Sequence, residues 1–85
     1  MDAATAIQGM VEVSGKSQRE VSQEIGKVPT FIGTTVYRRS SPRADTLARI
    51  AEACGFQLVL EGHGTRLVID GKPNNESASQ QLASL

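Results

Sequence analysis

Tryptophan is absent from this 85-residue sequence, only 4% of the residues are aromatic, and cysteine and histidine occur once each. The single cysteine, Cys54, cannot form an intramolecular disulfide, so the sequence fits a reducing compartment. One cysteine and one histidine, His63, also give too few ligands for a metal site. With 39% apolar residues, we expect one small core of modest stability, to which dimerisation would add buried surface.

Long apolar stretches are also missing. No run of about 18 or more apolar residues occurs, so we expect no membrane span and no membrane partner. The opening stretch, MDAATAIQGM, has no basic residue and no long apolar segment, unlike a secretory signal. Together these features predict a cytoplasmic protein.

Patterns typical of catalysis are not found. The sequence has no carboxylates paired by spacing, no nucleophile with a base partner and no glycine-rich phosphate loop. We therefore expect neither enzymatic activity nor a cofactor.

Charge is distributed unevenly, although the formal net charge is zero. Residues 16–49 carry seven basic and three acidic side chains, a net charge of +4, and the rest of the chain carries −4. A basic segment of this kind can attract phosphate groups, or it can simply be a solvated surface. Charge alone leaves both interpretations open.

Apolar residues recur at helical spacing in the first half of the chain. The spacing predicts a first helix over 3–13, with Asp2 as its N-cap. A capping box that begins at Ser17 predicts a second helix from about residue 18 to 25, and Gly26 can end it in the left-handed conformation.

Two further helices are expected before residue 56. Proline is tolerated in the first turn of a helix and not later, so Pro29 predicts that the third helix begins near residues 28–30. A loop at 38–43 separates it from the fourth helix. The buried stripe of the fourth helix is expected to be Leu47, Ile50, Ala51 and Cys54.

The pattern then changes to alternation. The stretches FQLVLE at 56–61 and RLVID at 66–70 alternate as half-buried strands do, with Gly62-His63-Gly64 between them. We expect a two-stranded hairpin over 56–73. One face, which could cover the core of one subunit, would carry Phe56, Leu58, Leu60, Leu67 and Ile69, and the other face Val59 and Val68. The small and polar residues 74–85 are expected to form a flexible tail.

Two short helices joined by a tight turn and packed among others form a helix-turn-helix arrangement. The stretches SQREVSQEIG at 17–26 and PRADTLARIA at 42–51, with Ile32 between them, resemble the lambda-repressor/Cro-like family of DNA-binding domains, also called XRE-like. The resemblance implies a mainly α, four-helix DNA-binding domain over residues 1–55. In this chain the hairpin follows, where many members of the family continue with a fifth helix.

The resemblance also implies which residues bind DNA, because a helix-turn-helix inserts its second helix into the major groove. The residues expected to contact bases are Pro29, Thr30, Gly33, Thr34 and Arg38. The residues expected to contact phosphates are Lys16, Gln18, Arg19, Lys27, Tyr37, Arg39 and Arg43. Threonine suits base contact, because its hydroxyl can hydrogen-bond to a base and its methyl can touch a thymine methyl. The threonines could instead form a solvated helix face, and Tyr37 could pack under the loop.

The third helix departs from the family pattern. An aliphatic residue is expected three positions after Ile32, where this chain has Thr35, followed by Val36. Either the helix is rotated, or Val36 fills the core from the neighbouring position. Phe31 could be a core residue or a wedge in the groove. Gly33 in mid-helix costs about 1 kcal/mol relative to alanine but would let the backbone approach DNA closely.

The hairpin indicates a dimer. An isolated two-stranded hairpin is marginally stable, and its open edges favour pairing with another chain, so we expect the hairpins of two subunits to associate about a twofold axis. The sequence thus predicts a dimeric repressor of transcription that binds a palindromic operator, from a phage or mobile element. Two alternatives stay open: an antitoxin whose tail or hairpin also binds a toxin, and a protein-interaction module that has lost DNA binding.

Overall fold

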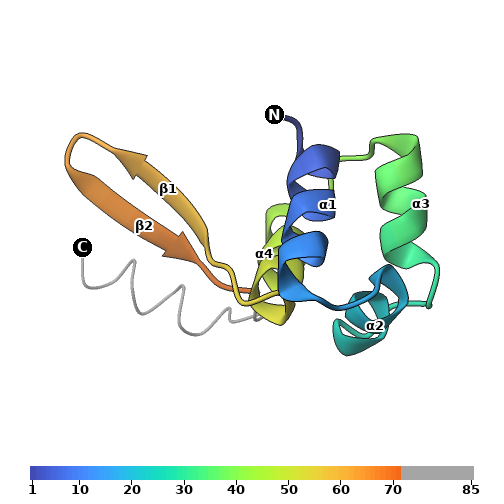
Figure 1. Ribbon diagram of the computed structural model, residues 1–85. Coiled ribbons are helices and arrows are strands. Elements are labelled where there is room, and N and C mark those ends of the chain that lie inside the picture. The colour runs from blue at the N-terminus through green and yellow to red at the C-terminus, as the bar shows by residue number, and fades with distance from the viewer. Residues whose placement is uncertain (72–85) are drawn as a thin grey trace.

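The computed structural model describes residues 1–71, and the predicted tail at 74–85 and the last two residues of the predicted hairpin lie outside them. The elements are α1 (Ala3–Ser14), α2 (Gln18–Glu24), α3 (Phe31–Arg38), α4 (Ala44–Ala53), β1 (Leu58–Gly62) and β2 (Thr65–Ile69). The helices form one cluster, here called the helical part, and the hairpin extends away from it (Figure 1). The fold is mainly α, with four helices and a two-stranded antiparallel hairpin, and this confirms the fold class that the sequence predicts.

Local hydrogen bonds explain where the first two helices begin. The Asp2 carboxylate accepts a hydrogen bond from the Thr5 backbone N–H at 2.9 Å. At α2, Ser17 and Glu20 make both bonds of the capping box, at 3.0 and 3.2 Å. The helix α1 ends before Gly15, whose φ of 76° favours glycine. Both predicted ranges, 3–13 and 18–25, are therefore confirmed to within one residue.

The helix α3 begins later than the sequence predicts. Its first residue is Phe31, with Thr30 as the N-cap, and Pro29 lies outside the helix. The Phe31 N–H donates to the Val28 carbonyl at 3.0 Å, which closes a turn with Pro29 in its second position. The fixed φ of proline suits that turn position as well as it suits a first helical turn.

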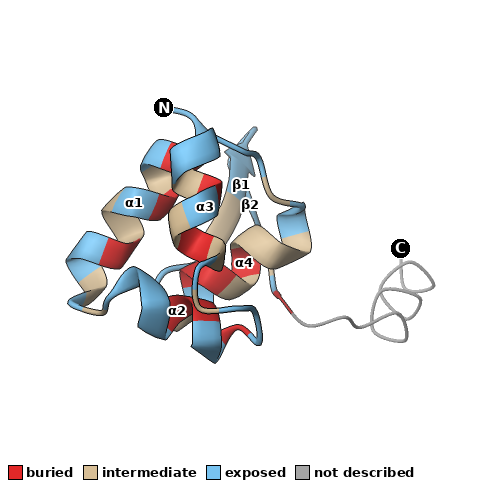
Figure 2. Ribbon diagram, turned by 90° about the vertical axis from the view of Figure 1, so that its right-hand side faces the viewer, coloured by how far each residue is buried: buried red, intermediate tan, exposed pale blue. Residues whose placement is uncertain are grey.

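The core lies where the four helices meet (Figure 2). The buried residues that form its central cluster are Ile7, Val11, Val21, Ile25, Ile32, Ile50 and Cys54. The predicted stripe of α4 is corrected at one place, because Ala48 is fully buried and Leu47 is only partly buried at the edge of the cluster. Ala48 lies one turn before Ala51, so it belongs to the same helical face.

The structure shows how α3 accommodates Thr35 at the position where the family pattern has an aliphatic residue. Thr35 takes the buried position and is 7% exposed, and its Oγ1 donates to the Phe31 carbonyl at 2.8 Å. A buried hydroxyl with a partner carries no large desolvation cost. Val36 is partly buried and packs against the core from the neighbouring position. Phe31 is also partly buried and packs against the core, which agrees with its interpretation as a core residue.

The turn of the hairpin lies within the predicted stretch 62–64, but β1 begins two residues later than predicted, so Phe56 precedes the strand. Gly62 is opposite Thr65, which leaves His63 and Gly64 as a two-residue turn, with φ of 51° and 68°. Positive φ at both positions is the pattern of a type I′ turn, whose twist matches that of paired strands. Leu58 faces Ile69 across the pair and Leu60 faces Leu67, while Val59 and Val68 share the other face.

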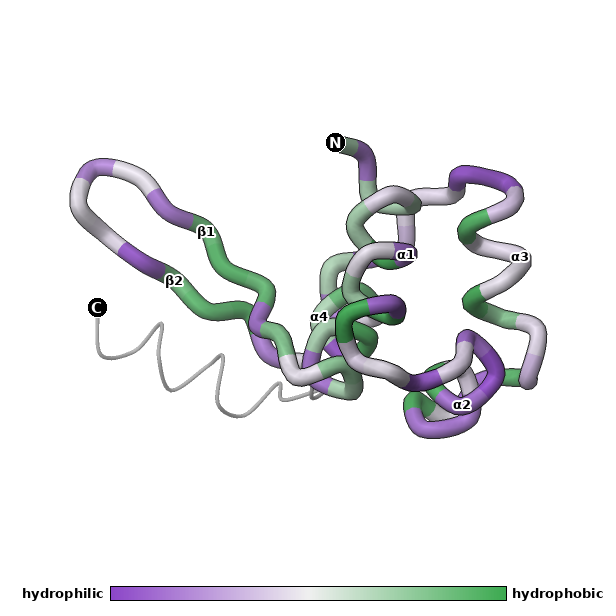
Figure 3. Tube along the Cα trace, viewed as in Figure 1, coloured by the Kyte–Doolittle hydropathy of each residue, from purple (hydrophilic) through white to green (hydrophobic). Residues whose placement is uncertain are grey.

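One expectation about the hairpin is wrong for the single chain. Leu60 and Leu67 are 55% and 58% exposed, because the hairpin projects beyond α4 and does not lie over the core (Figures 1 and 3). Half-buried residues of the two strands occur only near the base of the hairpin, at Leu58, Val59 and Ile69. An apolar surface is therefore left uncovered by the described residues of this chain.

Candidate nucleic-acid interface

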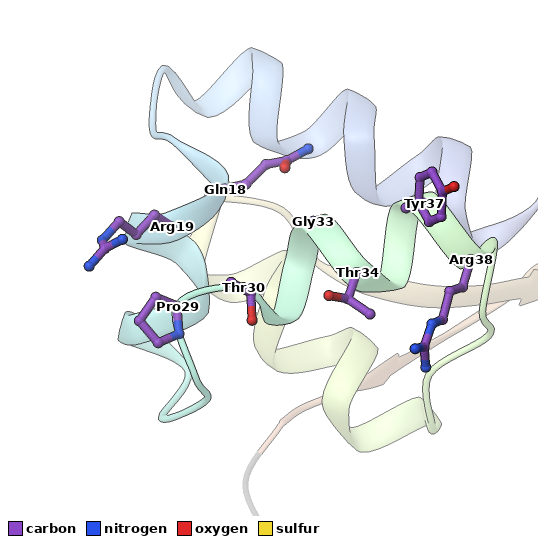
Figure 4. A pocket seen from close by; sticks show the side chains of 8 residues that line it. All are labelled: Gln18, Arg19, Pro29, Thr30, Gly33, Thr34, Tyr37 and Arg38. Atoms are coloured by element: carbon purple, nitrogen blue, oxygen red, sulfur yellow. The ribbon is translucent and has the colours of Figure 1, made fainter.

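The helices α2 and α3 together form an open hollow of about 530 Å³ (Figure 4). The residues that line it are Gln18, Arg19, Pro29, Thr30, Gly33, Thr34, Tyr37 and Arg38. Every one of them was predicted from the sequence to contact DNA. The structure therefore brings all five predicted base contacts and three of the predicted phosphate contacts to one surface, here called the α2–α3 surface.

The exposed side of α3 stands between two hollows. A second hollow of about 360 Å³ lies on the other side of the helix and is lined by Val28, Thr30, Phe31, Thr34, Thr35, Arg38, Ser40 and Pro42. Thr30, Thr34 and Arg38 line both hollows and are exposed. Their spacing of four places them in one row along the helix. The row forms a ridge that is polar at its first two positions and cationic at its last.

A buried serine fixes α2 against α3. Ser22 is fully buried, and its Oγ donates to the Gln18 carbonyl at 2.8 Å and accepts from the Ile32 backbone N–H at 3.0 Å. The Ile32 N–H lies in the first turn of α3, where backbone donors lack partners within the helix. The sequence alone assigns no role to Ser22; the position of this serine before a turn and a second helix was the available signal for the link.

A glycine leaves room for Gln18 over α3. A Cβ atom added at Gly33 would lie 3.2 Å from Gln18 Oε1, so the end of the Gln18 side chain sits where a larger residue would stand. Gly33 thus brings two predicted DNA contacts, one from each helix, into direct neighbourhood (Figure 4). Because Gly33 has no side chain, it adds no bulk beside Thr34, the middle residue of the ridge.

Arg19 and Arg38 are the cationic side chains that line the α2–α3 hollow, and the predicted phosphate contacts Lys27 and Arg43 lie outside its lining. Neither Arg19 nor Arg38 forms an ion pair with another of residues 1–71. Lys27 is exposed, and its Nζ lies 5.4 Å from the centre of the Phe31 ring, beside the start of α3. Arg43 is exposed and pairs loosely with Asp45, with Nε 3.4 Å from Oδ1, an interaction that adds little in water.

The structure also settles the surroundings of Tyr37. Its side chain is 88% exposed, so within the described chain it does not pack under the loop. Tyr37 lies at the C-terminal end of α3, where its side chain points away from that of Arg38 (Figure 4). Of the two interpretations of Tyr37, the one that leaves its hydroxyl available for phosphate agrees with this placement.

Two predicted phosphate contacts are engaged within the protein. Lys16 Nζ lies 2.9 Å from Glu24 Oε2 and donates to the Ala53 carbonyl at 2.8 Å, which joins the start of α2 to the end of α4. Arg39, in the left-handed conformation after α3, forms an ion pair with Asp2 and donates to Thr5 Oγ1 at 3.2 Å. Neither residue lines the α2–α3 hollow.

The surroundings of Asp2 change its acidity. Hydrogen bonds from Thr5, followed by the contact with Arg39, lower the pKa of Asp2 from its usual 3.8 to about 2. The carboxylate therefore stays charged at neutral pH while it caps α1 and holds the end of α3.

Metal binding, a reactive thiol and a membrane span find little support within residues 1–71. Among residues 1–71, no three histidine, cysteine or acidic side chains lie close enough together to hold a metal ion. Cys54 is part of the core, and burial raises the pKa of its thiol. None of the helices within residues 1–71 has the length and apolar character needed to cross a membrane.

Comparisons with protein-family models, with curated proteins and with solved structures gave no match to this chain. The interpretation of the α2–α3 surface therefore depends on the residues and the geometry described above.

Proposed function

We propose that this protein is a sequence-specific DNA-binding regulator of transcription, most simply a repressor, that binds a palindromic operator as a homodimer. The observation that carries the proposal is the ridge on α3. Thr30, Thr34 and Arg38 are exposed in one row between two hollows, which is the shape that a helix needs in order to enter a major groove.

In this proposal α3 reads the bases. The hydroxyl and methyl groups of Thr30 and Thr34 offer hydrogen bonds and apolar contact to base edges near the start of the helix. Arg38, four residues after Thr34 in the same row, would contact either a guanine or a phosphate. Gly33 makes room for the end of Gln18, so Gln18 and the start of α3 would meet the DNA together.

The helix α2 would position α3 on the DNA backbone. Gln18 and Arg19 lie at the start of α2 and line the same hollow, so they would meet the phosphates that flank the bases read by α3. Ser22 holds the two helices in one arrangement. Lys27 and Arg43 would add positive charge near the two helices. Contacts of this kind orient the protein without reading sequence.

The proposed dimer rests on the hairpin. Leu60 and Leu67 on one face and Val68 on the other are more than half exposed, and both strand edges of the two-stranded sheet lack a neighbour within residues 1–71. Association of two hairpins would cover these side chains. It would also present two α3 helices, which must lie roughly one DNA turn apart, about 34 Å, to read a palindrome.

The test is selection of binding sites from a duplex library of the source genome at two salt concentrations. We expect the wild type to select one palindromic site, with an affinity that falls as salt rises, because phosphate contacts release counterions. Thr34→Ala combined with Arg38→Ala should bind more weakly and with relaxed specificity. Thr65→Ala, which removes an exposed threonine from the hairpin, is the matched control and should select the wild-type site. Absence of any enriched sequence at low salt would contradict the proposal and favour a protein-interaction module.

A second candidate function is that of an antitoxin that binds DNA and also binds a toxin. The exposed apolar hairpin favours it, since a protein partner could cover the same side chains as a second copy. Co-purification of the product of a neighbouring gene, lost in a variant with polar hairpin residues, would distinguish this function from simple repression.

A further inference from the structure

The chain that follows β2 is bound to α4 at Gly71. Arg49 Nε donates a hydrogen bond to the Gly71 carbonyl at 2.9 Å, and the Gly71 N–H donates to Glu52 Oε2 at 3.1 Å. Both polar groups of one backbone unit are thus bound by side chains from neighbouring positions on α4. We call this arrangement the Gly71 contact.

Only glycine fits at this position. Gly71 is buried, and a Cβ atom there would lie 2.7 Å from the Arg49 backbone N and 2.9 Å from its Cα. These are backbone atoms of a helix, so they cannot move aside as the end of a side chain can. Gly71 is not among the residues with positive φ, so the requirement for glycine comes from close approach and not from an unusual backbone conformation.

The other end of the hairpin is fastened to the same helix. The Phe56 N–H donates to the Ala51 carbonyl at 2.7 Å, where the chain leaves α4 and enters β1. The two ends of the hairpin are thereby held at separate points of α4, while Leu60, Leu67 and the turn project beyond it (Figure 1). Two attachment points resist rotation of the hairpin about its base, whereas a single attachment point would allow it.

We infer that Gly71 is a positioning residue that sets the angle between the hairpin and the helical part. In the dimer, this angle determines the separation of the two α3 helices and so the spacing of the half-sites that the protein accepts. The second statement rests on the proposed function, and the first does not. A small rotation at the base is magnified along the hairpin, so loss of the Gly71 contact changes spacing much more than it changes the α2–α3 surface.

The angle is measured directly with spin labels. Cysteines replace Gln8 on α1 and Thr65 beside the hairpin turn, both exposed, in a full chain that also carries Cys54→Ala. Labelled chains are diluted with unlabelled ones so that only distances within one chain are read. We expect a single narrow distance peak for this background. Gly71→Ala should lose the narrow peak, because the added Cβ displaces the chain from α4.

The matched control is Gly62→Ala, the same substitution in the same hairpin, where an added Cβ has no atom within 4 Å. It should keep the narrow peak. Glu52→Ala removes one hydrogen bond without adding bulk and should broaden the peak, while Glu52→Gln keeps an oxygen acceptor and should restore it. If circular dichroism shows that Gly71→Ala does not fold, the Glu52 pair decides the question. Unchanged distance distributions in Gly71→Ala and Glu52→Ala would overturn the inference.

The consequence for DNA is tested with palindromes whose half-sites are separated by spacers of different lengths. The wild type and Gly62→Ala should select one spacing. Gly71→Ala should lose the spacing preference and keep the half-site sequence, a result that a merely destabilised fold would not give. If Gly71→Ala selects the wild-type spacing, the link to spacing is overturned. If the wild type selects no DNA sequence, the proposed function falls, and the spin-label result still decides the role of Gly71.

Discussion

Ile7, Ile32 and Ile50 in the helical part are fully buried, whereas Leu60, Leu67 and Val68 in the hairpin are more than half exposed. The two regions have comparable apolar side chains, yet only the helical part encloses its own. A region that buries its apolar surface within one chain can fold without a partner. A region that leaves its apolar surface exposed gains stability when it associates with another chain. The contrast separates a self-contained region with the α2–α3 surface from a region whose apolar side chains are left largely exposed by residues 1–71.

The largest effect that tests this contrast is expected in the core. Ile32→Ala should lower the free energy of unfolding by about 2–5 kcal/mol, because it removes a fully buried side chain and leaves a cavity. In a chain of this size such a loss leaves much of the population unfolded. Leu60→Ala, a change of similar size in the hairpin, should cost less than about 1 kcal/mol in a dilute sample. Urea unfolding measures both, and equal losses would contradict the contrast.

The next effect concerns association. Leu60→Lys combined with Leu67→Glu places opposite charges on residues that face each other across the strands, so the hairpin can keep its register while it loses its apolar face. Burial of a leucine is worth roughly 1.5–3 kcal/mol, so the dissociation constant of the dimer should rise by at least about tenfold.

Sedimentation over a range of concentrations measures this association. Val13→Lys is the control, because Val13 is an exposed apolar residue of the helical part, and its replacement should leave association unchanged. A wild-type chain that stays monomeric at every concentration would show that the hairpin is not the dimer interface.

A smaller effect separates stability from binding at the α2–α3 surface. Gly33→Ala should stabilise the chain by up to about 1 kcal/mol, since alanine is the better helix former and the atom it meets is the movable end of Gln18. The same change displaces Gln18 and widens the ridge, so DNA affinity should fall.

The matched control is Gly9→Ala in α1, where an added Cβ has no atom within 4 Å. It should stabilise the chain by a similar amount and leave DNA affinity unchanged. Denaturant midpoints and DNA titrations on the two variants give both quantities. A Gly33→Ala chain that binds DNA as well as wild type would exclude a role for this packing in recognition.

The smallest effect is a pH dependence at the N-terminus of α1. Because the pKa of Asp2 is lowered to about 2 in the folded chain, its charged form contributes stability above pH 3.8. That contribution should be lost as pH falls from about 4 towards 2. Asp2→Asn should lack this part of the pH dependence, as measured by thermal unfolding at several pH values. Parallel curves for wild type and variant would show that the Thr5 and Arg39 contacts do not act on stability.

Sequence reasoning succeeded where neighbouring residues decide the outcome. The capping box at Ser17, the turn at His63-Gly64 and the alternation of the hairpin faces depend on residues a few positions apart, so spacing reveals them. The eight residues of the α2–α3 surface were predicted from the resemblance to a helix-turn-helix family, which implies how the two helices of the motif are placed, and the structure brings these residues together. The start of α3 was missed because proline suits a turn and a first helical turn equally.

Contacts between distant parts of the chain could not be predicted in the same way. Lys16 binds the carbonyl of Ala53, and Arg39 pairs with Asp2 at the other end of the helical part. Nothing near these residues in the sequence signals a partner so far along the chain, so both looked like free cations. Gly71 was not singled out from the sequence, because the requirement for glycine there comes from the backbone of Arg49, which is distant in the sequence.

The last helix of the core also imposes an order on synthesis. Ile50 and Cys54 of α4 complete the cluster that Ile7 and Val11 begin, so we expect the helical part to stay open on the ribosome until α4 has emerged. The hairpin is made after α4, and the Gly71 contact closes last of these. Each chain would thus expose its apolar hairpin only once a finished helical part is there to hold it, which limits the time in which bare strands can aggregate.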